Sequence, residues 1–316
     1  MSRILITGGA GFIGSHLADR YLALGHEVTV IDNLASGKRE QVPAGATFVE
    51  TDVRSEEAAR LVREGSYDIV AHLAGQMDVR VSVRDPQYDA AVNISGTLNL
   101  LEAVRALDPA RRPRFMFSST GGVLYGDFVT PPNAEHVAKD PDSPYAISKL
   151  TAETYMAYYG RVHGMECVAL RFGNVYGPRQ DPHGEAGVIA IFCGRLQANE
   201  PFRIFGDGSQ TRDYIYVSDV VDAFVVASSA ALPPVGRLDA RAFNVGTGVE
   251  RTVVDVARGL QRAAGREVPI EFAPARPGEP LKSGLDPAKA AEVLGWRATT
   301  ALDEGLAATW RWITGA

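Results

Sequence analysis

A tyrosine and a lysine four positions apart, Tyr145 and Lys149, are the residues of this sequence best placed to do acid–base chemistry. Pro144, directly before them, is typical of the first turn of a helix, and residues four apart on a helix share a face. A free phenol has a pKa of about 10 and is a poor base at neutral pH, but a nearby ammonium favours the phenolate. The pair could therefore take a proton from a substrate hydroxyl. Taken alone, it could equally be a surface pair on an amphipathic helix.

Short hydroxyl side chains follow an apolar stretch that ends at Phe117. Ser118, Ser119 and Thr120 stand at the end of a predicted buried strand, where ligands bind in open α/β sheets. We expect Thr120 to donate a hydrogen bond to the substrate oxygen, with Ser118 or Ser119 assisting. The alternative is that these hydroxyls simply cap a turn.

A glycine-rich turn near the N-terminus indicates which kind of cofactor the Tyr145–Lys149 pair would use. Residues 3–7 are typical of a buried strand, and residues 12–24 have helical spacing of apolar side chains. Between them, Gly8 permits a tight turn, Gly11 permits close approach of a pyrophosphate, and Gly14 permits close packing of helix on strand. The helix N-terminus then offers free N–H groups to phosphates. We therefore expect a dinucleotide site.

An acidic residue at the end of the second predicted strand favours NAD as the dinucleotide. Residues 26–31 read as this strand, and Asp32 ends it about 20 residues after the glycines. A carboxylate there suits the ribose hydroxyls of NAD and repels the extra phosphate of NADP, although Arg39 lies nearby in sequence and leaves NADP open. With a nicotinamide site in the same chain, we interpret Tyr145 and Lys149 as catalytic.

Strand and helix patterns alternate through the first half of the chain, which predicts an α/β fold of the Rossmann type, a doubly wound parallel sheet with helices on both faces. Further strands are predicted at 47–50, 67–71, 114–117 and 166–170, and helices at 55–64, 86–106 and 144–163.

After about residue 175, turn-rich stretches separate helical runs at 186–199, 218–231, 252–264 and 286–294. Residues 242–245 look like a strand that returns to the main sheet. We expect a NAD-binding domain of residues 1–175 plus roughly 214–250, and a smaller interleaved α/β lobe of residues 176–213 and 251–316 that binds the substrate.

Composition narrows the class of protein. The 316 residues include 46% apolar and 22% charged residues with a formal net charge of −6, which argues against a nucleic acid or an anionic membrane as partner. Cys167 and Cys193 both lie in apolar stretches and are expected to be reduced core residues, so neither a disulfide nor a metal site is predicted. The first strand begins almost at Met1 and no apolar run is long enough to span a membrane, so we expect a cytoplasmic enzyme.

Further motifs extend the pattern along the whole chain. They are Asp32-Asn33-Leu34, Thr51-Asp52-Val53, His72-Leu73-Ala74-Gly75, the run from Arg171 to Arg179, the run from Gly206 to Tyr214, and Arg276-Pro277-Gly278-Glu279. With the glycine turn and the Tyr145–Lys149 pair, they make the chain resemble the extended short-chain dehydrogenases/reductases, and most closely the UDP-glucose (UDP-galactose) 4-epimerases. The resemblance implies oxidation of the sugar at C4, rotation of the 4-keto sugar, and return of the hydride to its other face, with tightly bound NAD regenerated in each turnover.

The resemblance also implies site residues. Tyr145 would be the base, Lys149 would hold the nicotinamide ribose, and Thr120 would bond the sugar O4. The cofactor would be bound by Gly8, Gly11, Phe12, Ile13, Gly14, Asp32, Asn33, Asp52, Val53, Leu73, Ala74, Gly75, Tyr145 and Lys149, with Asn93 behind the site. The UDP-sugar would be bound by Asn174, Arg179, Val188, Arg203, Phe205, Arg212, Arg276, Glu279 and Ser283, with the two arginines Arg212 and Arg276 on the diphosphate. Core packing or a solvated charge is a serious alternative for Val188, Arg203 and Asn93.

Alternatives differ in reaction and in sugar. Thr120 is followed by Gly121-Gly122, where related dehydratases carry an Asp-Glu pair, so no dehydratase activity is expected. Ser283 stands where narrow epimerases place a bulky aromatic, which implies activity on UDP-N-acetylhexosamines as well.

The nearest alternative is a UDP-glucuronate 4-epimerase, in which Arg80, Arg84 or Arg179 would meet the carboxylate. A non-catalytic NAD-binding protein is disfavoured because such proteins typically lose the tyrosine and the lysine. The family usually forms homodimers, to which the runs at 86–106 and 146–163 could contribute.

Overall fold

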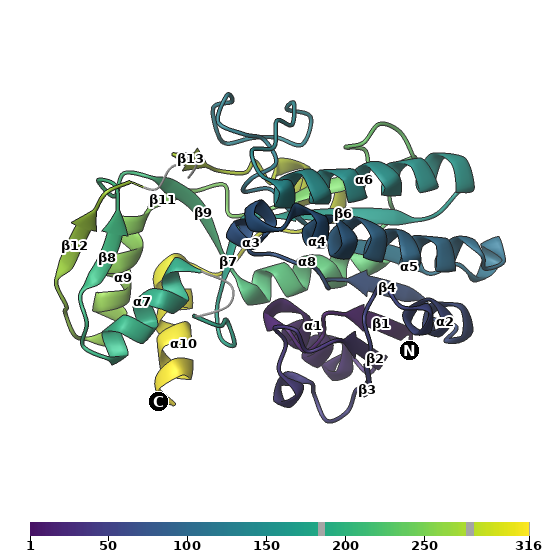
Figure 1. Cartoon of the computed structure of the whole chain (residues 1–316), viewed down its shortest axis with the longest axis horizontal. Coiled ribbons are helices and arrows are strands. Elements are labelled where there is room, and N and C mark those ends of the chain that lie inside the picture. The colour runs from purple at the N-terminus through teal and green to yellow at the C-terminus, as the bar shows by residue number, and fades with distance from the viewer. Residues whose placement is uncertain (183–186, 276–280, 316) are drawn as a thin grey trace.

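The computed structural model describes residues 1–182, 187–275 and 281–315, which form two lobes (Figure 1). The larger lobe is built on a seven-stranded sheet in the order β10-β6-β5-β4-β1-β2-β3, in which every neighbouring pair is parallel. Its strands are β1 (Arg3–Thr7), β2 (Glu27–Asp32), β3 (Thr47–Glu50), β4 (Ile69–His72), β5 (Arg114–Thr120), β6 (Cys167–Phe172) and β10 (Ala242–Val245). The predicted α/β fold class is confirmed, including the late strand that returns to the main sheet.

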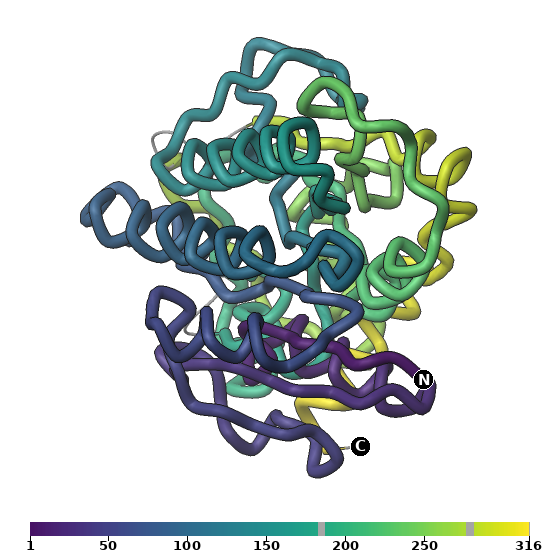
Figure 2. Tube along the Cα trace, turned by 90° about the vertical axis from the view of Figure 1, so that its right-hand side faces the viewer, coloured from purple at the N-terminus to yellow at the C-terminus, as the bar shows by residue number. Residues whose placement is uncertain are grey.

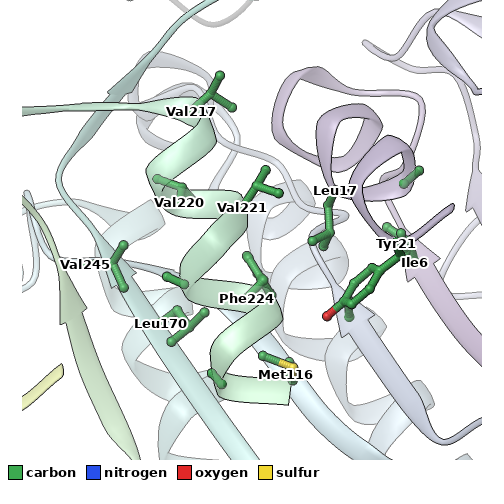
Figure 3. Packing of buried hydrophobic residues seen from close by; sticks show 14 of the residues in the cluster. Ile6, Leu17, Tyr21, Met116, Leu170, Val217, Val220, Val221, Phe224 and Val245 are labelled. Atoms are coloured by element: carbon green, nitrogen blue, oxygen red, sulfur yellow. The ribbon is translucent and has the colours of Figure 1, made fainter. Parts of the chain in front are cut away.

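Helices cover both faces of this sheet because its strands are apolar on both sides. Ile4 and Ile6 of β1 belong to one buried cluster and Leu5 between them belongs to another, as the alternation of side chains along a strand requires. The first cluster is closed by α1 (Phe12–Ala23) and α8 (Val217–Ser229). Figure 3 shows Leu17 of α1 and Phe224 of α8 packed over the sheet. The second is closed by α2 (Glu56–Glu64), α5 (Gly96–Arg105) and α6 (Pro144–His163).

The helical run predicted at 86–106 is interrupted by a wider turn. It consists of α4 (Pro86–Ala90), a π-helical turn at Ala91–Ser95 and α5, and it follows the short helix α3 (Val79–Arg84). A π turn of this kind is frequent at functional sites because it displaces side chains from regular helical spacing. Here it contains Asn93, which is buried. The run lies alongside α6 in both views (Figures 1 and 2).

The smaller lobe surrounds a short sheet and its own core. Strand β9 (Thr211–Tyr216) pairs with β7 (Asn174–Tyr176), β11 (Glu250–Thr252) and β13 (Lys282–Ser283), and β8 (Phe202–Phe205) pairs with β12 (Ile270–Ala273). The helices α7 (Val188–Gln197), α9 (Val253–Ala264) and α10 (Leu302–Thr314) close a separate apolar cluster. Strands of this lobe come from distant parts of the chain, as the interleaved pattern predicted.

Local differences from the predicted elements lie at their ends. β5 runs on to Thr120, so the three hydroxyl residues belong to the strand rather than to the turn after it. β4 begins at Ile69 instead of residue 67. The expected helix at 286–294 begins at Ala288 and continues as a π-helical turn at Ala290–Leu294. Among the described residues, no helix has the length and hydropathy needed to cross a membrane.

Candidate active site

The glycine turn between β1 and α1 has the geometry expected of a phosphate-binding turn. Gly8 has φ +71°, and a Cβ added to it would lie 2.6 Å from the backbone nitrogen of Ala74. A Cβ on Gly14 would lie 2.2 Å from the carbonyl oxygen of Gly8. Gly11 is the N-cap of α1, so the free N–H groups of the first helical turn open at this point. The chain can therefore hold a pyrophosphate against bare backbone.

A cavity of about 450 Å³ begins at this turn and passes along the carboxyl ends of the strands. Its lining includes every residue that the sequence analysis assigned to the cofactor, namely Gly8, Gly11, Phe12, Ile13, Gly14, Asp32, Asn33, Asp52, Val53, Leu73, Ala74, Gly75, Tyr145 and Lys149. The structure thus brings together residues spread over the first half of the chain. The bare glycine turn and the acidic strand end fit a dinucleotide.

The acidic end of β2 is held in place by backbone groups. Both oxygens of Asp32 accept hydrogen bonds, from the N–H of Ala10 at 3.0 Å and from the N–H of Leu34 at 2.8 Å. Burial nevertheless raises the pKa of Asp32. Arg39, which left NADP open, stacks on the ring of Phe48 at 4.4 Å and does not line the cavity. Without a cation at Asp32, the site favours ribose hydroxyls over a phosphate.

The Lys149 ammonium lies at the other end of this cavity, within α6. Its Nζ donates to the carbonyl oxygen of Ser118 at 3.0 Å and lies 4.7 Å from the ring centre of Phe117. Burial lowers the pKa of Lys149 to about 8, and the carboxylates of Asp89 and Glu153 oppose that shift. A buried ammonium with few polar contacts is well suited to meet a ligand in the cavity.

Tyr145, one turn before Lys149, faces the cavity and is only partly exposed. Burial and the negative charge of Asp89 raise its pKa, whereas a hydrogen bond with Thr120 lowers it. The protein alone therefore holds Tyr145 as the neutral phenol. The effect of Asp89 could not be predicted from the sequence, because nothing in the local pattern shows which carboxylates face the pair.

All three strand-end hydroxyl residues line the cavity, and two of them already donate a hydrogen bond within the protein. The Oγ of Ser118 donates to the carbonyl oxygen of His72 at 3.2 Å, and the Oγ of Ser119 donates to the carboxylate of Glu153. Both hydroxyl protons are thus used within the protein, while each oxygen keeps acceptor capacity, and the expected helping role of Ser118 and Ser119 stays a prediction. Thr120, which hydrogen-bonds with Tyr145, remains as the hydroxyl beside the reactive pair.

A second cavity of about 490 Å³ adjoins the first on the side of the smaller lobe. It is lined by Asn174, Val188, Arg203, Phe205 and Arg212, all of which the sequence analysis assigned to the substrate. Tyr145 lines both cavities, as do Phe12, Ile13, Gly173, Val175 and Met77. The candidate base therefore stands where the two cavities meet.

The remaining predicted substrate residues have different positions. Ser283 on β13 is buried and its Oγ donates to the carbonyl oxygen of Gly122 at 2.9 Å, next to the site. Arg179 lines neither cavity and forms an ion pair with Asp19 of α1 at 2.7 Å, and its expected substrate contact stays a prediction. Arg276 and Glu279 lie outside the described residues.

Several lining residues were not predicted from sequence. Gln76 and Met77 follow the His72–Gly75 motif directly, Gln180 follows the run from Arg171 to Arg179, and Gln210 lies within the run from Gly206 to Tyr214. Their nearness to those motifs was the available signal. Among the described residues, no group of His, Cys, Asp and Glu could hold a metal ion.

Comparison with known proteins agrees with this geometry. A model of the NAD dependent epimerase/dehydratase family matches residues 4–246. The chain belongs to this family. The UDP-glucose 4-epimerase of Mycolicibacterium smegmatis is 44% identical over 312 residues, which are 97% of each chain.

Solved structures of members of the epimerase/dehydratase family have the same fold over the whole chain. The UDP-glucose 4-epimerase of Thermotoga maritima with UDP-glucose matches with a TM-score of 0.92 and 42% identity, over 99% of both chains. The UDP-glucose 4-epimerase of Thermus thermophilus in complex with NAD matches with a TM-score of 0.90 and 43% identity, again over 99% of both. The expected family, Rossmann-type fold and NAD cofactor are thereby confirmed.

Proposed function

We propose that this protein is a NAD-dependent UDP-glucose 4-epimerase, which interconverts UDP-glucose and UDP-galactose through a 4-keto intermediate. The observation that carries the proposal is the position of Tyr145, which lines both the dinucleotide cavity and the second cavity. A proton acceptor at this junction can act on the carbon that faces a bound nicotinamide. The family and its UDP-glucose 4-epimerase relatives support the same assignment.

The catalytic roles follow from the geometry of the reactive pair. Bound NAD supplies a hydride acceptor that later returns the same hydride, and its positive charge favours the phenolate. Tyr145 then takes the proton of the sugar C4 hydroxyl and gives it back after the sugar has turned. Thr120 bonds the same oxygen, and Lys149 holds the nicotinamide ribose and keeps a positive charge near the phenolate. In the protein alone Tyr145 is therefore a neutral phenol, and it becomes a base only once NAD is bound.

The second cavity suits the nucleotide part of the substrate. We assign Arg212 to the diphosphate because a guanidinium matches phosphate oxygens, and Asn174 to the phosphates or the sugar. Val188, Arg203 and Phe205 would surround the uracil. Arg276 and Glu279 retain their proposed contacts with the diphosphate and the uridine ribose from the sequence alone. Binding through UDP leaves the sugar free to rotate.

The two glycines after Thr120 separate this activity from a dehydratase. A Cβ on Gly121 would lie 2.6 Å from the side chain of Leu285, so no side chain fits there without a shift. A Cβ on Gly122 would lie 3.6 Å from side-chain oxygens of both Asn174 and Ser283, so an acid there would face the site. The chain has no such acid, and elimination lacks its proton donor.

A glucuronate substrate is disfavoured by the arginines that could meet its carboxylate. Arg80 forms a bidentate ion pair with Asp78, with contacts of 3.1 and 2.7 Å, and Arg179 pairs with Asp19. Arg84 is exposed at the end of α3. To meet a carboxylate on C5, Arg80 or Arg179 would have to leave its present carboxylate partner, which a hydroxymethyl group does not require.

Activity on UDP-N-acetylhexosamines is proposed in addition, on the basis of Ser283. This small side chain lies beside Gly122 and Asn174, so the space near the sugar is not filled by a ring. Replacement by a large aromatic, Ser283→Tyr, should remove turnover of UDP-N-acetylglucosamine and spare that of UDP-glucose. Equal loss of both activities would contradict this placement.

We also propose a cytoplasmic homodimer in which residues 1–175 and roughly 214–250 form the NAD-binding domain. Support for the dimer comes from α6, where Ile147, Tyr155, Tyr158 and Val162 are exposed on a helix whose opposite side is buried. Apolar side chains gathered in this way are typical of protein–protein contacts.

The function is tested by offering the purified protein UDP-glucose, UDP-galactose, UDP-glucuronate and UDP-N-acetylglucosamine in parallel and resolving the products by stereochemistry. We expect interconversion of UDP-glucose and UDP-galactose without added NAD, because the cofactor is retained. Formation of 4-keto-6-deoxy products, or turnover of UDP-glucuronate alone, would refute the proposal.

A further inference from the structure

A buried carboxylate that the proposed reaction does not use lies behind the reactive pair. Asp89 on α4 is 1% exposed. Its Oδ1 accepts hydrogen bonds from the side-chain amides of Gln76 at 2.8 Å and of Asn93 at 3.1 Å. Burying a carboxylate is costly unless hydrogen bonds and a nearby positive charge compensate it. Both donors are neutral amides, so the compensating positive charge must come from another group.

The amide of Asn93 connects Asp89 to the catalytic helix. Its Nδ2 lies 3.1 Å from the Oγ of Ser148, the residue before Lys149, and its Oδ1 accepts from the backbone N–H of Gln76 at 2.8 Å. The same Oδ1 lies 2.9 Å, and the Nζ of Lys149 lies 3.2 Å, from the position that a Cβ on Gly75 would occupy. The side chains of Asn93 and Lys149 therefore both lie close to Gly75, and the amide of Asn93 also contacts Asp89.

We propose that Asp89 is the buried counter-charge of the Tyr145–Lys149 pair, a positioning residue that sets the pH range in which the pair works. The inference rests on the proposed function of that pair. Asp89 is held on α4, which packs against α6, and the amides of Gln76 and Asn93 fix its orientation. It touches neither cavity, so its effect on the pair is electrostatic.

The direction of the effect does not depend on which group of the pair loses its proton first. A nearby negative charge opposes every proton dissociation, so it raises both apparent pKa values of a coupled pair. In agreement, Asp89 contributes an upward shift to the pKa of Tyr145 and to that of Lys149. Removal of the charge should therefore move both limbs of the pH–rate profile to lower pH.

The other titratable groups near Tyr145 and Lys149 are neutral, ion-paired or exposed to solvent. Burial and the Lys149 ammonium lower the pKa of His72 on β4 to about 3, so this ring is neutral. Glu153 on α6 also raises the pKa of Lys149, but it is ion-paired with Arg171 at 2.6 Å. Around the start of α3 and α4, Asp78 pairs with Arg80, and Arg84 and Asp85 are exposed.

The test compares Asp89→Asn with wild type, both carrying their bound NAD. Asparagine keeps the shape and an acceptor oxygen for Gln76 and Asn93 but removes the charge. We expect both limbs of kcat/KM against pH to move down by about one pH unit, which is a tenfold change in each ionisation constant. The matched control is Glu102→Gln, which changes an exposed carboxylate on α5 of the same helical run and should leave both limbs in place.

A second readout separates this inference from the proposed function. The tyrosinate absorbance of each protein, minus that of its Tyr145→Phe counterpart, follows Tyr145 directly and should titrate at lower pH in Asp89→Asn even if UDP-glucose is not the substrate. Loss of rate with both limbs unmoved, or limbs that move in opposite directions, would overturn the inference. If Asp89→Asn does not fold, Asp89→Ser, which also removes the charge, is titrated in its place by the same criteria.

Discussion

The buried ion pair of Arg171 with Glu153 allows a quantitative test of how the reactive strand end is held. Arg171 on β6 is 0% exposed, and its guanidinium contacts Glu153 at 2.6 Å and Asp239 at 2.8 Å. Glu153 in turn accepts the hydroxyl proton of Ser119. The change Arg171→Met keeps most of the side-chain volume but leaves Glu153 without its cation. Breaking a buried pair from one side costs about 3–5 kcal/mol of folding free energy.

The expected loss lies toward the upper part of this range. Glu153 is 2% exposed and cannot regain water, and Arg171 also donates to the hydroxyl of Tyr125 at 3.2 Å and to the carbonyl oxygen of Glu135 at 3.3 Å. The unfolding midpoint should fall by roughly 6–8 °C for a chain of this size. The rate of epimerisation should fall as well, because Ser119 precedes Thr120 on β5 and shares its strand end.

Thermal unfolding followed by tryptophan fluorescence measures the first effect. The matched control is Arg262→Met, since Arg262 forms an ion pair with Asp303 at 3.1 Å in which both side chains are largely exposed. Surface pairs contribute about 0–1 kcal/mol, so the midpoint should hardly move. In the double variant Arg171→Met/Glu153→Leu, no charge of this pair remains buried, and part of the lost stability should return. The reasoning is refuted if Arg171→Met melts within about 2 °C of wild type, or if the double variant is less stable than both single ones.

Three further changes test the site itself. Gly8→Ala should lower the NAD content of the purified protein, measured by absorbance after denaturation, because its Cβ meets the backbone of Ala74, whereas Gly25→Ala, with a similar φ of +80° but nothing within 4 Å, should retain NAD. Equal loss in both would show that φ alone decides. Tyr145→Phe should lower kcat by about 10²–10⁴-fold with NAD content unchanged, and surviving turnover would exclude Tyr145 as the base. Arg212→Lys should raise KM for UDP-glucose about tenfold with little change in kcat, and an unchanged KM would remove Arg212 from the diphosphate.

The sequence was sufficient for the fold and for the cofactor cavity because both depend on local patterns. Apolar runs with helical or alternating spacing locate β1, α1 and β2, and the parallel order then brings their carboxyl ends together. Gly8, Asp32 and Leu73 each mark the end of a strand of that sheet, so predicting the strands also predicted that these residues meet.

The sequence could not show which partners a polar side chain has when those partners are far away along the chain. Ser119 and Arg179 have the residue types and positions of ligand contacts, and in the structure they are bonded to Glu153 on α6 and to Asp19 on α1. Asp89 was overlooked because its neighbours Asn93 and Gln76 reach it through a π turn and a loop, neither of which has a sequence signal comparable to a strand. Such pairings depend on packing, which spacing along the chain does not record.

The hydrogen bonds of β9 affect whether the two lobes can move apart to make room for rotation of the sugar. This strand pairs with β7, β11 and β13, and Asp213 on it accepts from the backbone N–H groups of Thr247 and Gly248, just after β10 of the main sheet. The carboxylate of Asp213 thus ties the smaller lobe to the turn after β10 by two backbone hydrogen bonds, and a rotation of one lobe against the other would break both. We therefore expect the space for the ketosugar to be present before the substrate arrives, where the two cavities meet at Tyr145. A compound that fills this junction would occupy the space in which the sugar turns.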